Sequence, residues 1–199
     1  MYRSILYGSD SYLTTSGWRE TVKRGYPCRP DGSPLPWMNF AIIQFLEERL
    51  TKEMRLFEYG SGYSTLFYAS LVGEVISVEN DREWYATITR QLPDNAKVFF
   101  AAADVDGDYC RAIVGAADSI DIVVVDGRDR VNSFKQGLLS LNETGVIILD
   151  DSMRERYKPA HDLAHENGFR AINFYGLKPQ GISNERSTLF YRQVNCLGI

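Results

Sequence analysis

The sequence has few cysteines and no long apolar run, and each shortage removes a class of protein. Its three cysteines, Cys28, Cys110 and Cys196, are odd in number, widely spaced and without a CxxC pair. They predict free thiols in a reducing compartment rather than a disulfide framework. No stretch approaches the roughly 20 apolar residues of a membrane span, and the start MYRSILYGSDSY lacks the apolar run of a signal peptide. We therefore expect a cytoplasmic protein with no membrane partner.

Signals for zinc, calcium and nucleic acid are also sparse. The two histidines, His161 and His165, are four residues apart in HDLAH, which lacks the glutamate of an HExxH zinc motif. The acidic run DVDGD at 104–108 lacks the later glycine and glutamate of an EF-hand loop. The net charge of −4 argues against a broad footprint on a phosphate backbone. We therefore expect no nucleic-acid partner; the oligomeric state stays open.

What the sequence does contain is a regular alternation of short apolar runs with helical patterns. DIVVVD and GVIILD are apolar without alternation, as in parallel strands that helices cover on both faces. Five strand–helix units in a row predict a doubly wound α/β sheet. The expected strands are Arg55–Tyr59, Glu74–Glu79, Ala96–Ala102, Ser119–Asp126, Gly145–Asp150, Phe169–Tyr175 and Ser187–Arg192. The expected helices between them are Tyr63–Val72, Arg82–Leu92, Asp108–Ala117, Arg130–Asn142 and Lys158–Asn167. The last two strands have no helix between them, which predicts an antiparallel pair or two separate strands.

Residues 1–37 differ from the rest. They are rich in Gly, Pro, Ser and Tyr and end in RPDGSPLPW. We expect an irregular N-terminal arm over 1–37 and one domain over 38–199, in which a helical pattern begins at Met38.

The stretch FEYGSGYSTLFY places a glycine turn directly after the first strand. Ligands of open α/β sheets bind outside such strand ends, where glycine lets the backbone approach them. A tight turn without a ligand is the alternative. Thr65 stands where a dinucleotide fingerprint has its third glycine, which disfavours NAD.

Acidic residues end the next two strands. Glu79, in VEN, lies about 20 residues after the turn, where a carboxylate accepts hydrogen bonds from ribose hydroxyls. Asp104 follows the third strand, in position to accept from an adenine amine.

With FEYGSG, VEN and the helix-free terminal strand pair, residues 38–192 resemble the class I S-adenosylmethionine-dependent methyltransferases. The resemblance implies a Rossmann-like, seven-stranded mixed sheet with an antiparallel last strand and helices on both faces. It also implies that the methionine part of the cofactor lies against the turn, the ribose against Glu79 and the adenine against Asp104. The implied cofactor-binding residues are Glu58, Gly60, Ser61, Gly62, Glu79, Asn80 and Asp104.

The fourth and fifth strands end in VVVDGRDR and IILDDSMRER, which are similar to metal-dependent, catechol-type O-methyltransferases. That resemblance implies Mg²⁺ as a candidate cofactor with Asp126, Asp150 and Asp151 as ligands. Asp126, Arg128 and Asp150 are the candidate catalytic residues. A lysine usual in such enzymes is absent here, and Arg128 is a poor base because it stays protonated. The alternative is that arginines neutralise the acidic cluster.

Two functions follow from these patterns. The first is an S-adenosylmethionine-dependent methyltransferase acting on a small molecule, with oxygen as the expected acceptor atom. The second is a non-catalytic or differently acting binding protein that keeps the fold. Trp37 and Tyr63 are candidates for a pocket wall beside the glycine turn.

Overall fold

A computed structural model describes residues 4, 7–116 and 119–199. Its centre is a seven-stranded sheet in the order β3-β2-β1-β4-β5-β7-β6. The strands are β1 Arg55–Tyr59, β2 Glu74–Glu79, β3 Ala96–Phe100, β4 Ile120–Val125, β5 Leu141–Leu149, β6 Arg170–Gly176 and β7 Glu185–Tyr191. The first five are parallel, and β7 is antiparallel to both β5 and β6. The predicted fold class is confirmed.

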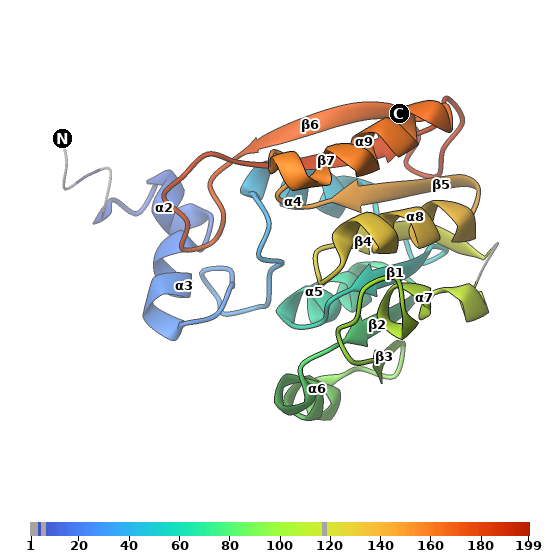
Figure 1. Cartoon of the computed structure of the whole chain (residues 1–199). Helices are drawn as coiled ribbons and strands as arrows, with labels where there is room; N and C mark the ends of the chain where they lie inside the picture. Colours follow the sequence, from blue (N-terminus) through green and yellow to red (C-terminus); the bar gives the residue numbers. More distant parts are fainter. Residues whose placement is uncertain (1–3, 5–6, 117–118) are drawn as a thin grey trace.

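Helices cover both faces of this sheet (Figure 1). They are α4 Phe40–Arg49, α5 Tyr63–Leu71, α6 Arg82–Ile88, α7 Asp108–Arg111, α8 Arg130–Ser140 and α9 Lys158–Glu166, with 3-10 turns η1 Thr89–Gln91, η2 Val114–Ala116 and η3 Glu155–Tyr157. Two of them begin at side-chain caps that satisfy free backbone N–H groups. The Asn39 Oδ1 atom accepts from the Ile42 N–H of α4, and Asp81 accepts from the first turn of α6.

The unbroken apolar runs supply a core on each side of the sheet. Consecutive residues of β4 belong to different cores: Ile122 and Val124 pack with α4 and α5, while Val123 and Val125 pack with α8 and α9. Successive strand residues point to opposite faces, so a strand buried on both faces has no polar alternation.

The boundaries differ from the predictions mainly where turns interrupt the elements. The predicted helix Asp108–Ala117 is the short α7 followed by η2, and its last residue lies outside the described ranges. The α8 helix ends at Ser140, and β5 starts at Leu141 rather than at Gly145. The register shift between β4 and β5 shows the cause, because Ile120 pairs with Leu141 but Ile122 pairs with Val146. The residues between form an irregularity inside the strand.

The described part of the N-terminal segment includes the short helices α2 Tyr12–Thr15 and α3 Trp18–Arg24, so it is less irregular than predicted. These helices lie beside the sheet on the side where the arrow of β5 ends (Figure 1). The Trp18 indole N–H donates to the Gly181 carbonyl at 2.7 Å, which ties the segment to the β6–β7 connection. The rings of Tyr26 and Tyr63 stack at 4.5 Å, which ties it to the start of α5. In the described part of the chain, no helix is long and apolar enough to cross a membrane.

Candidate functional site

The site lies where the strand order reverses, between β1 and β4, which is where open α/β sheets bind ligands. The turns after these two strands touch. Gly60 has φ +97°, and a Cβ atom there would lie 3.3 Å from the Gly127 Cα. A side chain at position 60 would therefore strain the backbone and make an unusually tight contact with the turn after β4. The backbone conformation and this packing favour glycine at position 60 whether or not a ligand binds.

Glu58, in β1, stabilises the glycine turn through hydrogen bonds to the first residues of α5. Its carboxylate is buried and accepts from Ser64 Oγ, from Thr65 Oγ1 at 2.6 Å and from Ser77 Oγ at 2.9 Å. Thr65 Oγ1 in turn accepts from the Gly62 N–H at 3.0 Å. Burial raises the pKa of Glu58 to about 7, while the three hydroxyl donors lower it. The residue therefore fixes the turn from which the predicted methionine contacts would come.

Glu58 should give the stability of the protein a marked pH dependence. Its pKa rises from an ordinary 4.5 to about 7, so this group favours the folded state most below pH 4.5. That contribution is lost as pH rises through 7, and it amounts to about 3 kcal/mol. Urea unfolding from pH 5 to pH 8 should show a decline in the wild type that Glu58→Gln makes smaller. Glu143→Gln, at an exposed position of β5, is the matched control and should leave the decline in place. A decline of the same size in Glu58→Gln would contradict the assignment.

Glu79, at the end of β2, points back to the glycine turn. Its Oε2 accepts from the N–H and the hydroxyl of Ser61 at 3.1 and 2.9 Å, and its Oε1 accepts from the N–H groups of Asn80 and Asp81, both at 2.8 Å. A carboxylate has about four acceptor positions, so these donors occupy all of them. The Trp84 indole N–H donates to the Ser61 carbonyl at 2.8 Å and fixes the other side of the turn.

Asp104 lies apart from this group. Its carboxylate accepts from the backbone N–H groups of Asp108 and Tyr109, at 2.8 and 3.3 Å, and so caps α7. It is exposed and does not line the cavity beside Glu79. The structure therefore gives Asp104 a local capping role, and the contact with adenine remains a prediction.

The three aspartates at the ends of β4 and β5 are paired with cations from the chain itself. The Asp126 carboxylate forms an ion pair with the Arg130 guanidinium at 2.8 Å. Asp150 is fully buried. Its carboxylate forms an ion pair with the Lys178 ammonium at 2.5 Å and accepts a hydrogen bond from the Ser187 hydroxyl at 2.7 Å. The Asp151 carboxylate forms ion pairs with the same Lys178 ammonium and with Arg154, both at 2.6 Å.

This pairing corrects the predicted magnesium site. The position between Asp150 and Asp151 is taken by the Lys178 ammonium, a cation that neutralises both carboxylates. Among the residues that the structure describes, no group of three acidic, histidine or cysteine side chains is arranged to hold a metal ion. The donor set therefore does not fit Mg²⁺. The alternative was neutralisation by Arg128, Arg154 and Arg156. Of these, the structure pairs Arg154 with the cluster, and the other cations are Arg130 and Lys178.

The aspartates differ in proton affinity. Burial and the nearby Asp150 raise the pKa of Asp126 well above its ordinary value, and Arg130 and Lys178 oppose that rise. Burial also acts to raise the pKa of Asp151, but its bond to Lys178 and the arginine charges outweigh burial and lower it. Asp126 is thus the stronger base of the two, and 26% of its side chain is exposed.

Two adjoining cavities meet at Asp126. A cavity of about 290 Å³ is lined by the turns after β1 and β4 and by Glu79 and Asn80. A second, of about 530 Å³, is lined by the N-terminal segment and the start of α5, including Trp37, Tyr63 and Trp84. Both include Ser61, Ser64 and Asp126. The prediction that Trp37 and Tyr63 wall a pocket is confirmed.

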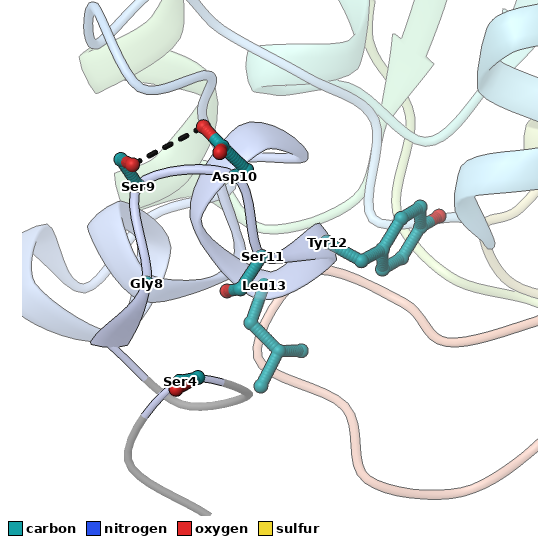
Figure 2. Close-up of a pocket in the computed structure, with 7 residues that line it drawn as sticks. All are labelled: Ser4, Gly8, Ser9, Asp10, Ser11, Tyr12 and Leu13. Carbon is teal, nitrogen blue, oxygen red and sulfur yellow. Dashed lines mark hydrogen bonds between the residues drawn. The ribbon is translucent and has the colours of Figure 1, made fainter. Parts of the chain in front are cut away.

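A third hollow, of about 570 Å³, lies at the N-terminal segment and has no part in this site. Figure 2 shows the residues around it, among them Tyr12 and Leu13, with the hydroxyl of Ser9 donating to Asp10. No predicted site residue lines it. Its size therefore has no bearing on the chemistry at the sheet.

Sequence reasoning missed Lys178, Arg130 and Trp84. Arg130 had a usable signal, since it follows Asp126 by four residues at the start of a helix, where such pairs meet. Lys178 had none, because it lies in the β6–β7 connection, 27 residues beyond Asp151, and reaches the cluster only through the folded sheet.

Comparison by sequence identifies no relative: no family profile matches the chain, and no curated protein matches it. Comparison by structure gives many similar folds, and three of them illustrate the likeness. A methyltransferase-like protein from Silicibacter pomeroyi has TM-score 0.56 and 24% identity, over 80% of this chain and 90% of that one. A precorrin-6y C5,15-methyltransferase from Geobacter metallireducens has TM-score 0.58 and 14% identity, over 76% and 87%. A tRNA methyltransferase from Aquifex aeolicus has TM-score 0.57 and 18% identity, over 88% and 75%.

These neighbours also correct one prediction. The net charge led us to expect no nucleic-acid partner, but a protein of the same fold is a tRNA methyltransferase. Overall charge is therefore not a ground for excluding nucleic acid in this fold. With its strand order 3-2-1-4-5-7-6 and these neighbours, the chain has the Rossmann-like fold of the class I S-adenosylmethionine-dependent methyltransferases.

Proposed function

We propose that the protein is an S-adenosylmethionine-dependent methyltransferase that acts on a hydroxyl group of a small molecule. The observation that carries this proposal is the pair of cavities that meet at Asp126. One lies against the glycine turn and Glu79, and the other is walled by aromatic rings. A donor in the first and an acceptor in the second would adjoin at a single carboxylate.

The cofactor cavity offers contacts suited to a nucleoside. The Ser61 hydroxyl already donates to Glu79 at 2.9 Å, which is the kind of bond that a ribose hydroxyl makes. A ribose that replaces it exchanges one hydroxyl for another and leaves the buried carboxylate satisfied. Gly60 brings the backbone close to the ligand, and Asn80 lies beside Glu79 in the same cavity.

The acceptor cavity supplies position and a base. When bound, S-adenosylmethionine supplies an electrophilic methyl group on a sulfonium. The chain's task is then to orient the acceptor oxygen and remove its proton, because in-line displacement depends on alignment. Asp126, with its raised pKa, is the group placed to take that proton. The rings of Tyr63 and Trp84, 5.9 Å apart, give the cavity an aromatic wall.

The other two candidate catalytic residues are given different tasks in this proposal. Asp150 is fully buried and holds Lys178, so we assign it to positioning. The exposed Arg128 lines the cofactor cavity and stays protonated, so we assign it to positioning rather than to proton transfer. The rival function is a binding protein that keeps the fold and the ligand but transfers no methyl group. Ligand binding without turnover would distinguish it.

S-adenosylmethionine should stabilise the protein and NAD should not. Thr65 stands in place of the third glycine of a dinucleotide fingerprint, and its hydroxyl holds the Gly62 N–H and Glu58. A ligand at 100 times its Kd raises the free energy of unfolding by about 2.7 kcal/mol. Melting scans with S-adenosylmethionine, S-adenosylhomocysteine and NAD test this. Equal shifts for all three, or a shift with NAD alone, would contradict the cofactor assignment.

A further inference from the structure

A hollow of about 360 Å³ beside the cofactor cavity is lined by four arginines, Arg128, Arg130, Arg154 and Arg156. They come from two places in the chain, the turn after β4 with the start of α8 and the segment after β5 that leads into η3. Asp129 is the carboxylate in the lining, and it already accepts from the Asp106 N–H and the Asn132 amide.

The four guanidinium groups differ in whether they have a carboxylate partner. Arg130 is paired with Asp126, and Arg154 with Asp151. Arg156 has no carboxylate partner among the described residues; it donates to the Tyr157 hydroxyl at 3.0 Å and lies 4.9 Å from that ring. The Arg128 guanidinium has no hydrogen bond or ion pair within residues 4, 7–116 and 119–199. A protein with net charge −4 thus keeps two uncompensated guanidinium groups in one hollow.

We propose that this hollow binds a phosphate or carboxylate group of the methyl acceptor. Guanidinium forks match the geometry of such oxyanions, and two of them aimed at one anion make charge-assisted bonds. The hollow shares Gly127, Arg128 and Arg130 with the cofactor cavity but no residue with the aromatic-walled cavity. An acceptor in the aromatic-walled cavity therefore has to extend past Asp126, which Arg130 contacts at 2.8 Å, to place its anionic group in the hollow. This inference rests on the proposed function for its meaning, since it names the class of acceptor, but the binding site itself is tested without any cofactor.

The test is calorimetric titration of the whole protein with inorganic phosphate and with acetate, at constant ionic strength set by chloride. Arg156→Gln removes one free charge from the hollow, and this residue does not line the cofactor cavity. We expect phosphate affinity to fall about tenfold. Arg90→Gln is the matched control, because Arg90 is exposed in η1 and remote from the hollow. An equal loss in both variants, or no loss in Arg156→Gln, would overturn the proposal.

Two further measurements separate the possible failures. Arg156→Gln should keep the full melting shift with S-adenosylmethionine, so loss of phosphate binding with an intact shift supports the anion site alone. The source of the anion is decided by comparing phenyl phosphate with a short single-stranded RNA. A site for one anionic group gives both ligands a salt dependence near that of one charge. A slope of several charges with the RNA would overturn the single-group site, because it reports contacts to many phosphates.

Discussion

Lys178→Met is expected to lower the free energy of unfolding by about 3–5 kcal/mol, because it leaves buried carboxylates without their cation. The Lys178 ammonium lies 2.5 Å from Asp150, which is fully buried, and 2.6 Å from Asp151. Methionine keeps the length of the side chain, so the loss reports charge rather than volume. Urea unfolding at pH 7 is the measurement.

The matched control for this variant is Lys158→Met. Lys158 also lies 2.5 Å from an aspartate, Asp162, but both side chains are more than half exposed. Surface pairs of this kind contribute about 0–1 kcal/mol, so the control should change little. Adding Asp150→Asn to Lys178→Met should recover part of the loss, since it removes one unpaired charge. Wild-type stability in Lys178→Met, or stabilisation of the wild type by Mg²⁺ that EDTA reverses, would return the cluster to the metal interpretation.

The sheet was predictable because its signals are local. The bounds of β1 and β2 are those expected from the apolar runs, and the unbroken valines of β4 indicated a strand covered on both faces. The predicted bounds are wrong where one element ends and the next begins with no polar segment between them. Leu141 reads as the end of a helix by periodicity, yet it pairs with Ile120 and begins β5. Such a boundary is decided by the neighbouring strand.

The site divides in the same way. Glu58, Gly60 and Glu79 belong to one strand–helix–strand unit, so their meeting follows from the topology of any parallel pair. The acidic cluster is different. Its carboxylates were visible at the ends of β4 and β5, but the cation between two of them comes from the β6–β7 connection. No spacing rule links position 150 to position 178, so the sequence left a metal ion and arginine as the candidate partners of the aspartates.

The backbone gives a second, independent indication of where function lies. Asp129 and Asp151 adopt left-handed conformations, with φ of +42° and +51°, in the turns after β4 and β5. Such conformations are uncommon for residues other than glycine and gather at functional sites. Asp129 is part of the lining of the arginine-lined hollow, and Asp151 forms an ion pair with Arg154, which is also part of the lining. Both of these turns thus lie beside the arginine-lined hollow.

Asp126→Asn is expected to slow methyl transfer by a factor of about 10²–10⁴, the range that a positioned general base contributes. Asparagine has nearly the same size, and its carbonyl still accepts from Arg130, so the two cavities should keep their shape. Affinity for S-adenosylmethionine should therefore change little, and the loss should appear in kcat.

The measurement is release of S-adenosylhomocysteine with a panel of phosphorylated and carboxylated alcohols as acceptors. In the wild type the rate should fall on acidification as Asp126 takes up a proton, because its pKa is raised. That acidic limb should be missing in Asp126→Asn, whereas loss of rate through misfolding would leave it in place. Asp94→Asn, at an exposed position before β3, is the matched control and should keep both rate and limb. If Asp126→Asn turns over at the wild-type rate, methyl transfer here needs no carboxylate base, and Asp126 serves only to hold Arg130 at the edge of the arginine-lined hollow.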